Sequence, residues 1–300
     1  MRISSSQYHN TMISALQLAN DGVNQAMQQL ATGQRILKPS DDPIGTLRLS
    51  RLSREESALA QYRDNIGALQ SRLSNSEATL DSMKGDLQSL RDLLVWAADG
   101  GNTPSDLNAM SGSLQTLQES LLYLANTKNA EGRYLFSGTA SDQPTVVVTA
   151  GPPATYTAGG NTETQPVAVA DSTNVPANVS LQEMAPFLQQ LSTLTAQLAS
   201  PTVTASGVQP AVQSMIDSLD QTLGAVASKI GQLGGRQNVI NTLDGNQASV
   251  SLSNQQSALK IGKTDYAEAA TRLDSFTLAL KATQSAYAKV SELSLFDVIR

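Results

Sequence analysis

The chain has 300 residues, a formal net charge of −6 and no cysteine. Its 20 lysine and arginine residues are scattered, which argues against nucleic acid as a partner because phosphate binding needs clustered positive charge. Charged residues make up 15% and aromatic residues 4%, so the composition favours thin helical bundles over a wide core, and the lack of cysteine excludes disulfides and zinc–thiolate sites.

The N-terminal region predicts an amphipathic helix. Its first ten residues are polar and lack the apolar core of a cleavable signal peptide, so a secreted fate would need another export route. No run reaches the roughly 20 apolar residues that a membrane span needs, and we expect no membrane insertion. Heptad spacing follows at Met12, Leu16, Ala19, Val23, Ala26 and Leu30.

The segment from 44 to 98 predicts one long helix. From Leu59 to Ala97 apolar residues recur at alternating steps of three and four, with Ser76 as the one exception. Asp42 before Pro43 is typical of a helix N-cap, and a helix of this length spans roughly 80 Å. A period of 3.5 residues indicates a partner along the whole length.

Three further helices complete the predicted bundle. Thr103 and Pro104 begin the second after a Gly100–Gly101 turn, so it should run antiparallel to the first. A third is expected from about Ala185. A fourth long helix follows a loop at 201–210, and its three interior glycines favour close packing or a kink: Gly231, Gly234 and Gly235.

A small β-rich insert is expected at 141–180. Strand-like stretches are 133–138, 145–149, 154–157 and 166–169, separated by Gly- and Pro-rich turns. Forty residues offer little core of their own, so the insert should lean on the helices.

The C-terminal region carries a second stripe, and the final residues 293–300 are unusually apolar. A lone amphipathic helix is marginal in water, so we expect the two ends to pair with each other and with other molecules. One monomeric bundle that buries both stripes is the alternative. The predicted assembly interface comprises Met12, Leu16, Ala19, Val23, Leu30, Leu273, Phe276, Leu280, Tyr287, Val290, Leu293 and Phe296.

The sequence offers few candidates for catalytic residues. His9 is the single histidine and is expected to be a solvated surface residue, so neither a catalytic triad nor a multi-histidine metal site can be built around it. Helix capping accounts for the adjacent acids Asp41 and Asp42. Trp96 is expected to pack. We therefore predict no enzyme, no metal and no cofactor.

Several segments together resemble the flagellin superfamily, and within it the hook–filament junction branch. The resemblance covers both ends of the chain and not residues 141–180. It rests on residues 1–7, 30–36, 38–43, 129–138, 265–269 and 291–296.

The resemblance implies an arrangement and a route of export. The fold would be mainly α: an elongated antiparallel coiled coil or helical bundle formed by both ends, with a small β-rich insert. Three domains follow from it: a terminal coiled-coil assembly domain of 1–35 plus 263–300, a central helical bundle of 36–140 plus 181–262, and an outward insert of 141–180. Members would be exported unfolded by the flagellar type III apparatus, with a chaperone bound to the C-terminal region.

The leading hypothesis is a structural, extracellular subunit that joins hook to filament by forming a junction ring. Its partners would be further copies, a neighbouring hook-associated protein and flagellin. A filament-forming flagellin is the first alternative, and a cytoplasmic coiled-coil scaffold is the alternative of another class.

Overall fold

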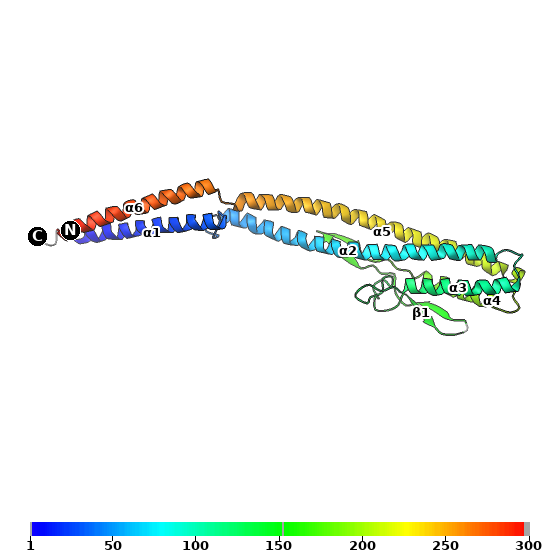
Figure 1. Cartoon of the computed structure of the whole chain (residues 1–300). Coiled ribbons are helices and arrows are strands. Elements are labelled where there is room, and N and C mark those ends of the chain that lie inside the picture. Colours follow the sequence, from blue (N-terminus) through cyan, green and yellow to red (C-terminus); the bar gives the residue numbers. More distant parts are fainter. Residues whose placement is uncertain (1, 152, 297–300) are drawn as a thin grey trace. The chain divides into compact units, whose positions relative to one another are not determined.

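The computed structural model describes residues 2–151 and 153–296, and the side chains of residues 7–289 apart from 152. This part of the chain forms six helices and four short strands (Figure 1). The helices are α1 (Arg2–Thr32), α2 (Pro43–Ala97), α3 (Pro104–Ala125), α4 (Met184–Leu198), α5 (Ala205–Gly262) and α6 (Tyr266–Phe296). The strands are β1 (Val146–Thr149), β2 (Thr155–Ala158), β3 (Pro166–Ala170) and β4 (Thr173–Pro176).

The chain divides into two compact units. The terminal unit comprises residues 1–58 and 249–300, and the central unit comprises residues 59–248. Each contains parts of α2 and α5, which are 55 and 58 residues long. The mainly α fold class with a small β insert is confirmed.

In the central unit, α2 and α5 lie side by side and antiparallel (Figure 1). Side-chain contacts join them, among them Arg63 Nε to Asp244 Oδ1 at 3.0 Å, Gln70 Nε2 to Asn241 Oδ1 at 2.7 Å, and Arg91 Nε to Asp220 Oδ1 at 2.9 Å. Partner numbers on α5 fall as those on α2 rise, as antiparallel packing requires. Such exposed ion pairs contribute about 0–1 kcal/mol each, so these contacts fix register more than stability.

The heptad stripe predicted on α2 is its buried face. Every stripe position from Ile66 to Ala97 is buried, including Ser76, whose hydroxyl donates to the Arg72 carbonyl at 2.9 Å. That bond satisfies the hydroxyl within its own helix, which explains why one polar residue is tolerated in the stripe. Each fully buried leucine contributes about 1.5–3 kcal/mol.

The start of α3 has the predicted cap. Thr103 Oγ1 accepts from the Asp106 backbone N–H at 3.3 Å, and an Asp106 carboxylate oxygen accepts from the Thr103 N–H at 3.0 Å. The Thr103 hydroxyl and N–H hold the pKa of Asp106 below its usual range. Reciprocal capping satisfies backbone donors that the helix itself cannot.

The β insert consists of two antiparallel hairpins, β1–β2 and β3–β4. The predicted strand at 133–138 is wrong: the backbone there makes isolated bridges, and Gly138 adopts a positive φ of 71° that ends extension. Strand β4 is missing from the prediction because its sequence, Thr-Asn-Val-Pro, has weak strand character. The β3–β4 hairpin is held by α2 and α5, since Asn65 donates to the Ala168 carbonyl and Gln247 to the Val169 carbonyl.

Helix α5 differs from the prediction at its start and in its interior. It begins at Ala205, within the predicted loop, because Thr204 caps it with its hydroxyl accepting from the Gly207 N–H at 3.3 Å. Pro210 is therefore inside the helix. The prediction of close packing at its interior glycines is also wrong, since no neighbouring atom lies within 4 Å of a Cβ built at Gly231, Gly234 or Gly235.

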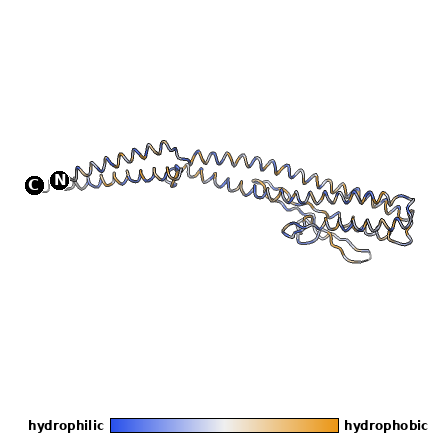
Figure 2. Tube along the Cα trace, in the orientation of Figure 1, coloured by the Kyte–Doolittle hydropathy of each residue, from blue (hydrophilic) through white to orange (hydrophobic). Residues whose placement is uncertain are grey.

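Hydrophobic and hydrophilic residues alternate along the helices (Figure 2). This amphipathic pattern lets each helix bury one stripe and leave the rest to water. In the described part of the chain, no helix combines the length and the apolar character that crossing a membrane requires.

Candidate assembly interface

In the terminal unit, α1 and α6 pair along their length and run antiparallel (Figure 1). Three contacts show the order: His9 Nδ1 lies 3.1 Å from the Tyr287 hydroxyl, a Cβ built at Gly22 would lie 2.8 Å from the Phe276 ring, and one at Gly33 would lie 2.8 Å from the Tyr266 hydroxyl. The two chain ends therefore pair with each other, as the sequence indicates. His9, expected to be solvated, is exposed but also packs on the Tyr287 ring.

The predicted interface residues line the seam between these two helices. Ala19 is buried; Phe276 lies at the edge of the seam on Gly22. The half-buried members are Met12, Leu16, Val23, Leu30, Leu273, Leu280 and Tyr287. Val290, Leu293 and Phe296 belong to α6, but their side chains lie outside the described residues. Whether these residues contact other molecules stays a prediction.

A second apolar set on the same helices faces away from the seam. Leu18 is 73% exposed, Leu278 is 70% exposed and Met27 is 55% exposed. Two paired helices cover only one face of each other, so these side chains have no cover in the terminal unit. Heptad reasoning missed them because they lie off the stripe. The signal that finds them is an isolated large apolar residue on an otherwise polar helical face.

Two short segments, residues 33–42 between α1 and α2 and residues 263–265 between α5 and α6, are joined by hydrogen bonds and together form the connector. The Arg35 N–H donates to the Gly262 carbonyl at 2.7 Å, and the Thr264 N–H donates to the Gly33 carbonyl at 2.9 Å. Gly33 has a φ of 68°, which a residue with a side chain adopts at a cost. The Arg35 guanidinium also donates to the Ile261 carbonyl at 3.0 Å, near the C-terminus of α5.

Asp41 and Asp42 organise the other side of the connector. Asp42 caps α2, with Oδ1 accepting from the Gly45 N–H at 2.8 Å and Oδ2 bound to Arg35 at 2.8 Å. These contacts, the Gly45 N–H first and Arg35 second, hold the pKa of Asp42 below its usual range. Asp41 Oδ2 accepts from the Leu37 and Lys38 N–H groups at 3.0 and 2.9 Å. The capping role predicted for Asp42 is confirmed, while Asp41 holds the preceding turn.

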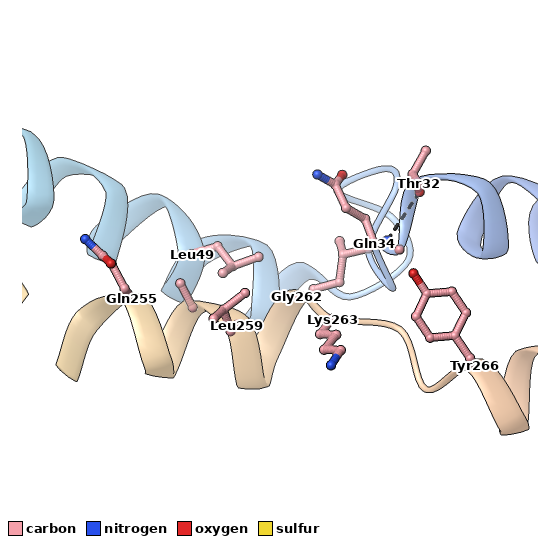
Figure 3. A pocket seen from close by; sticks show the side chains of 11 residues that line it. Thr32, Gln34, Leu49, Gln255, Leu259, Gly262, Lys263 and Tyr266 are labelled. Carbon is pink, nitrogen blue, oxygen red and sulfur yellow. Dashed lines mark hydrogen bonds between the residues drawn. The ribbon is translucent and has the colours of Figure 1, made fainter. Parts of the chain in front are cut away.

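An apolar hollow opens beside the connector, wholly within the terminal unit (Figure 3). Its volume is about 700 Å³. Ile36, Leu49, Leu259 and Tyr266 supply its apolar wall, and Lys263 is its charged lining residue. Leu259 and Tyr266 are more than half exposed, so the hollow is open to solvent.

The remaining predictions about sites concern metal-binding residues and Trp96. In the part of the chain that the structure covers, no cluster of three or more His, Cys, Asp or Glu side chains is placed to hold a metal ion. Trp96, expected to pack, is 55% exposed instead. Its neighbours Leu94 and Ala97 fill the core, so the helix turns the indole outward.

Comparison with known proteins places this architecture among flagellar proteins. A family model described as the bacterial flagellin N-terminal helical region matches residues 3–141. The chain is 26% identical over 111 residues to flagellar hook-associated protein 3 of Escherichia coli (strain K12), an alignment that covers 37% of this chain and 35% of that protein. It is 24% identical over 138 residues to the protein of the same name from Salmonella typhimurium, covering 46% and 44%. The chain thus spans less than half the length of these curated relatives.

A solved structure extends the match to most of the chain. It is described as that of a flagellar hook-associated protein from Vibrio parahaemolyticus, and its TM-score is 0.68. The identity is 31%, and the match covers 74% of this chain and 99% of that structure. Together with the N-terminal family match, this shows that the chain belongs to the flagellin superfamily, in its branch of flagellar hook-associated proteins.

Proposed function

We propose that this chain is a structural subunit of the bacterial flagellum that joins hook to filament by assembling into a junction ring. Family membership supports a flagellar role. The single structural observation that carries the proposal is the set of uncovered leucines, Leu18 and Leu278, on helices already paired through their other faces. Apolar side chains in such positions gain stability only when another molecule covers them.

Burial of the same leucines supplies the driving force for assembly. Burial of apolar surface contributes about 25 cal/mol per Å², so a leucine that passes from exposed to buried contributes about 1.5–3 kcal/mol. Several such contacts per subunit, repeated around a ring, hold copies together without any covalent chemistry. Contacts between different surfaces of identical subunits give a ring when the rotation closes.

The partners and the route of export belong to this proposal. The subunit would contact further copies, a neighbouring hook-associated protein and flagellin. It would leave the cell through the flagellar export apparatus, and a chaperone would cover the C-terminal region until then. The exposure of Leu278 on α6 supports a need for such cover before assembly. The subunit would act without catalysis and without a cofactor, in keeping with a family of structural components.

Truncation tests the proposal. Deleting residues 1–30 or 270–300 removes one partner of the α1–α6 pair but leaves the central unit, residues 59–248, whole. We expect each truncated chain to remain monomeric in sedimentation velocity and to keep a cooperative thermal transition in circular dichroism. An ordered polymer formed by either truncated chain would refute the proposal.

A filament-forming flagellin is the second candidate, since the matching N-terminal family is that of flagellins. It would use the same apolar faces but polymerise without limit. Electron microscopy of the purified full chain separates the two: a junction subunit forms short oligomers, and a flagellin forms long filaments.

A further inference from the structure

The hollow beside the connector carries unpaired positive charge at its rim. Lys263 lines it, and Lys260 lies three residues earlier on α5; neither forms an ion pair with any residue that the structure describes. Neither nearby acid pairs with these lysines: Asp265 accepts from the Ala267 N–H at 2.9 Å, and Glu268 pairs with Arg272. An apolar group with adjacent negative charge would therefore fit this hollow.

One end of α2 offers such a group. Val95 and Trp96 are both more than half exposed there, and Trp96 is the only tryptophan of the chain. Asp92 lies four residues before Trp96 on α2, so its carboxylate lies on the helical face of the indole, and Asp99 lies just beyond the end of α2, in the turn that follows it. Segment 92–127 contains no lysine or arginine, and Arg91, which precedes Asp92, pairs with Asp220 at 2.9 Å.

The backbone around Trp96 is held in place. The Asn102 side chain donates to the Trp96 carbonyl at 2.7 Å and to the Asp99 carbonyl at 3.1 Å. Asp99 itself accepts from the Gly101 N–H at 3.0 Å, which closes the turn that follows α2. Because this backbone is already held, little backbone entropy is lost when the exposed indole binds, and tryptophan is among the residues that most often dominate interfaces.

The two units also differ in net charge. The terminal unit, residues 1–58 and 249–300, has 12 Lys and Arg against 10 Asp and Glu, whereas the central unit, residues 59–248, has 8 against 16. Two copies that bring an acidic central unit to a slightly basic terminal unit attract each other. Two copies that bring like units together gain nothing from charge.

We propose that the hollow of one copy binds Trp96 of a second copy, with Asp92 and Asp99 facing Lys260 and Lys263. The inference rests on the proposed function, since it names one contact by which copies assemble. The contact joins different surfaces of the two molecules, so each copy keeps one free end. A buried indole covers about 150–250 Å², which makes it the central anchor of a larger contact and not the whole of it.

Intrinsic fluorescence reports this contact directly, because the full chain has one tryptophan. As purified wild-type protein is concentrated and oligomers form in sedimentation velocity, we expect the Trp96 emission to shift to shorter wavelength. Trp96→Ala and Leu259→Glu should each weaken association at least about tenfold. Val239→Glu, a similarly exposed site on α5, should leave association unchanged.

Mixing the two defective variants tests whether the contact joins two different surfaces, the hollow of one copy and Trp96 of the other. Trp96→Ala keeps an intact hollow, and Leu259→Glu keeps its tryptophan, so an equimolar mixture should form dimers and shift the emission although neither variant does so alone. Charge exchange gives a second test: Lys263→Glu should weaken association, and Asp99→Lys in the same chain should restore it.

The outcomes separate this inference from the proposed function. Oligomers that form without an emission shift, or that Trp96→Ala forms equally well, would overturn the inference and leave the proposed function standing. That result would point to another occupant, such as Leu18 of α1. A chain that stays monomeric with an unshifted emission also overturns the inference, and immunogold labelling of isolated flagella with an antibody to this chain then tests the proposed function alone.

Discussion

Asp42 binds two elements through one carboxylate. It caps α2 through the Gly45 N–H and holds Arg35, whose guanidinium also reaches the Ile261 carbonyl on α5. The sequence reveals half of this role, because an acid before Pro43 is typical of a cap. The other half needs residues more than 200 positions apart to meet, which local spacing cannot show.

The lowered pKa of Asp42 predicts a pH dependence of the connector. Because the folded-state pKa lies below the ordinary aspartate value of about 3.9, the contribution to stability is complete above that value. It is lost as the pH falls through the folded-state pKa. The protection factor of the Gly45 amide in hydrogen exchange, which corrects for the intrinsic pH dependence of the rate, should therefore fall at acid pH in the wild type and already be low at neutral pH in Asp42→Ala. Equal protection in both proteins at neutral pH would contradict this role.

Gly22 makes room for the Phe276 ring in the α1–α6 seam. A Cβ at this position would lie 2.8 Å from the ring, so Gly22→Val should separate the helices locally, at a cost of about 1–3 kcal/mol beyond helix propensity. Gly67→Val is the matched control, because nothing lies within 4 Å of its Cβ. Hydrogen exchange of α1 amides measures the effect. Adding Phe276→Ala to Gly22→Val should recover part of the loss, and no recovery would show that the ring is not the cause.

At the scale of elements, α5 carries glycines that its packing does not require. Gly231, Gly234 and Gly235 face open space, and glycine in a helix interior costs about 1 kcal/mol relative to alanine. Each Gly→Ala change should therefore raise the free energy of unfolding of the full chain by up to about 1 kcal/mol in urea titrations. A loss of stability at any of the three would mean that the glycine serves a close contact or a bend.

Helices with a continuous stripe could be predicted from the sequence, and elements without one could not. The α2 stripe from Ile66 to Ala97 is buried as expected, because a 3.5-residue period leaves one geometry in which all its members meet a partner. The start of α5 and strand β4 were misplaced or missed. A single capping threonine fixes the start of α5. Pairing with β3 and a hydrogen bond from Arg236 of α5 to the Pro176 carbonyl fix β4, and neither leaves a periodic signal.

The candidate interface was predicted only in part, for a related reason. Periodicity identifies residues that meet one constant partner, so it found the seam between α1 and α6. Leu18, Leu278 and Trp96 meet no partner within the described chain, and their exposure became visible only once the helices were placed. The assignment of chain segments to three domains stays a prediction.

At the scale of the whole molecule, the outward leucines should govern assembly without governing folding. Leu18→Ser combined with Leu278→Ser should leave the thermal transition unchanged and weaken association at least about 100-fold, since each buried leucine contributes about 1.5–3 kcal/mol. Val239→Ser, exposed on α5, is the control. Sedimentation velocity measures association, and wild-type assembly by the double variant would place the interface elsewhere.

The position of the protein on isolated flagella tests the central claim most directly. Immunogold labelling of hook–filament preparations should place this chain in a single narrow band where the hook meets the filament. Labelling along the whole filament would identify a flagellin instead. A chain found only inside the cell would contradict the account altogether.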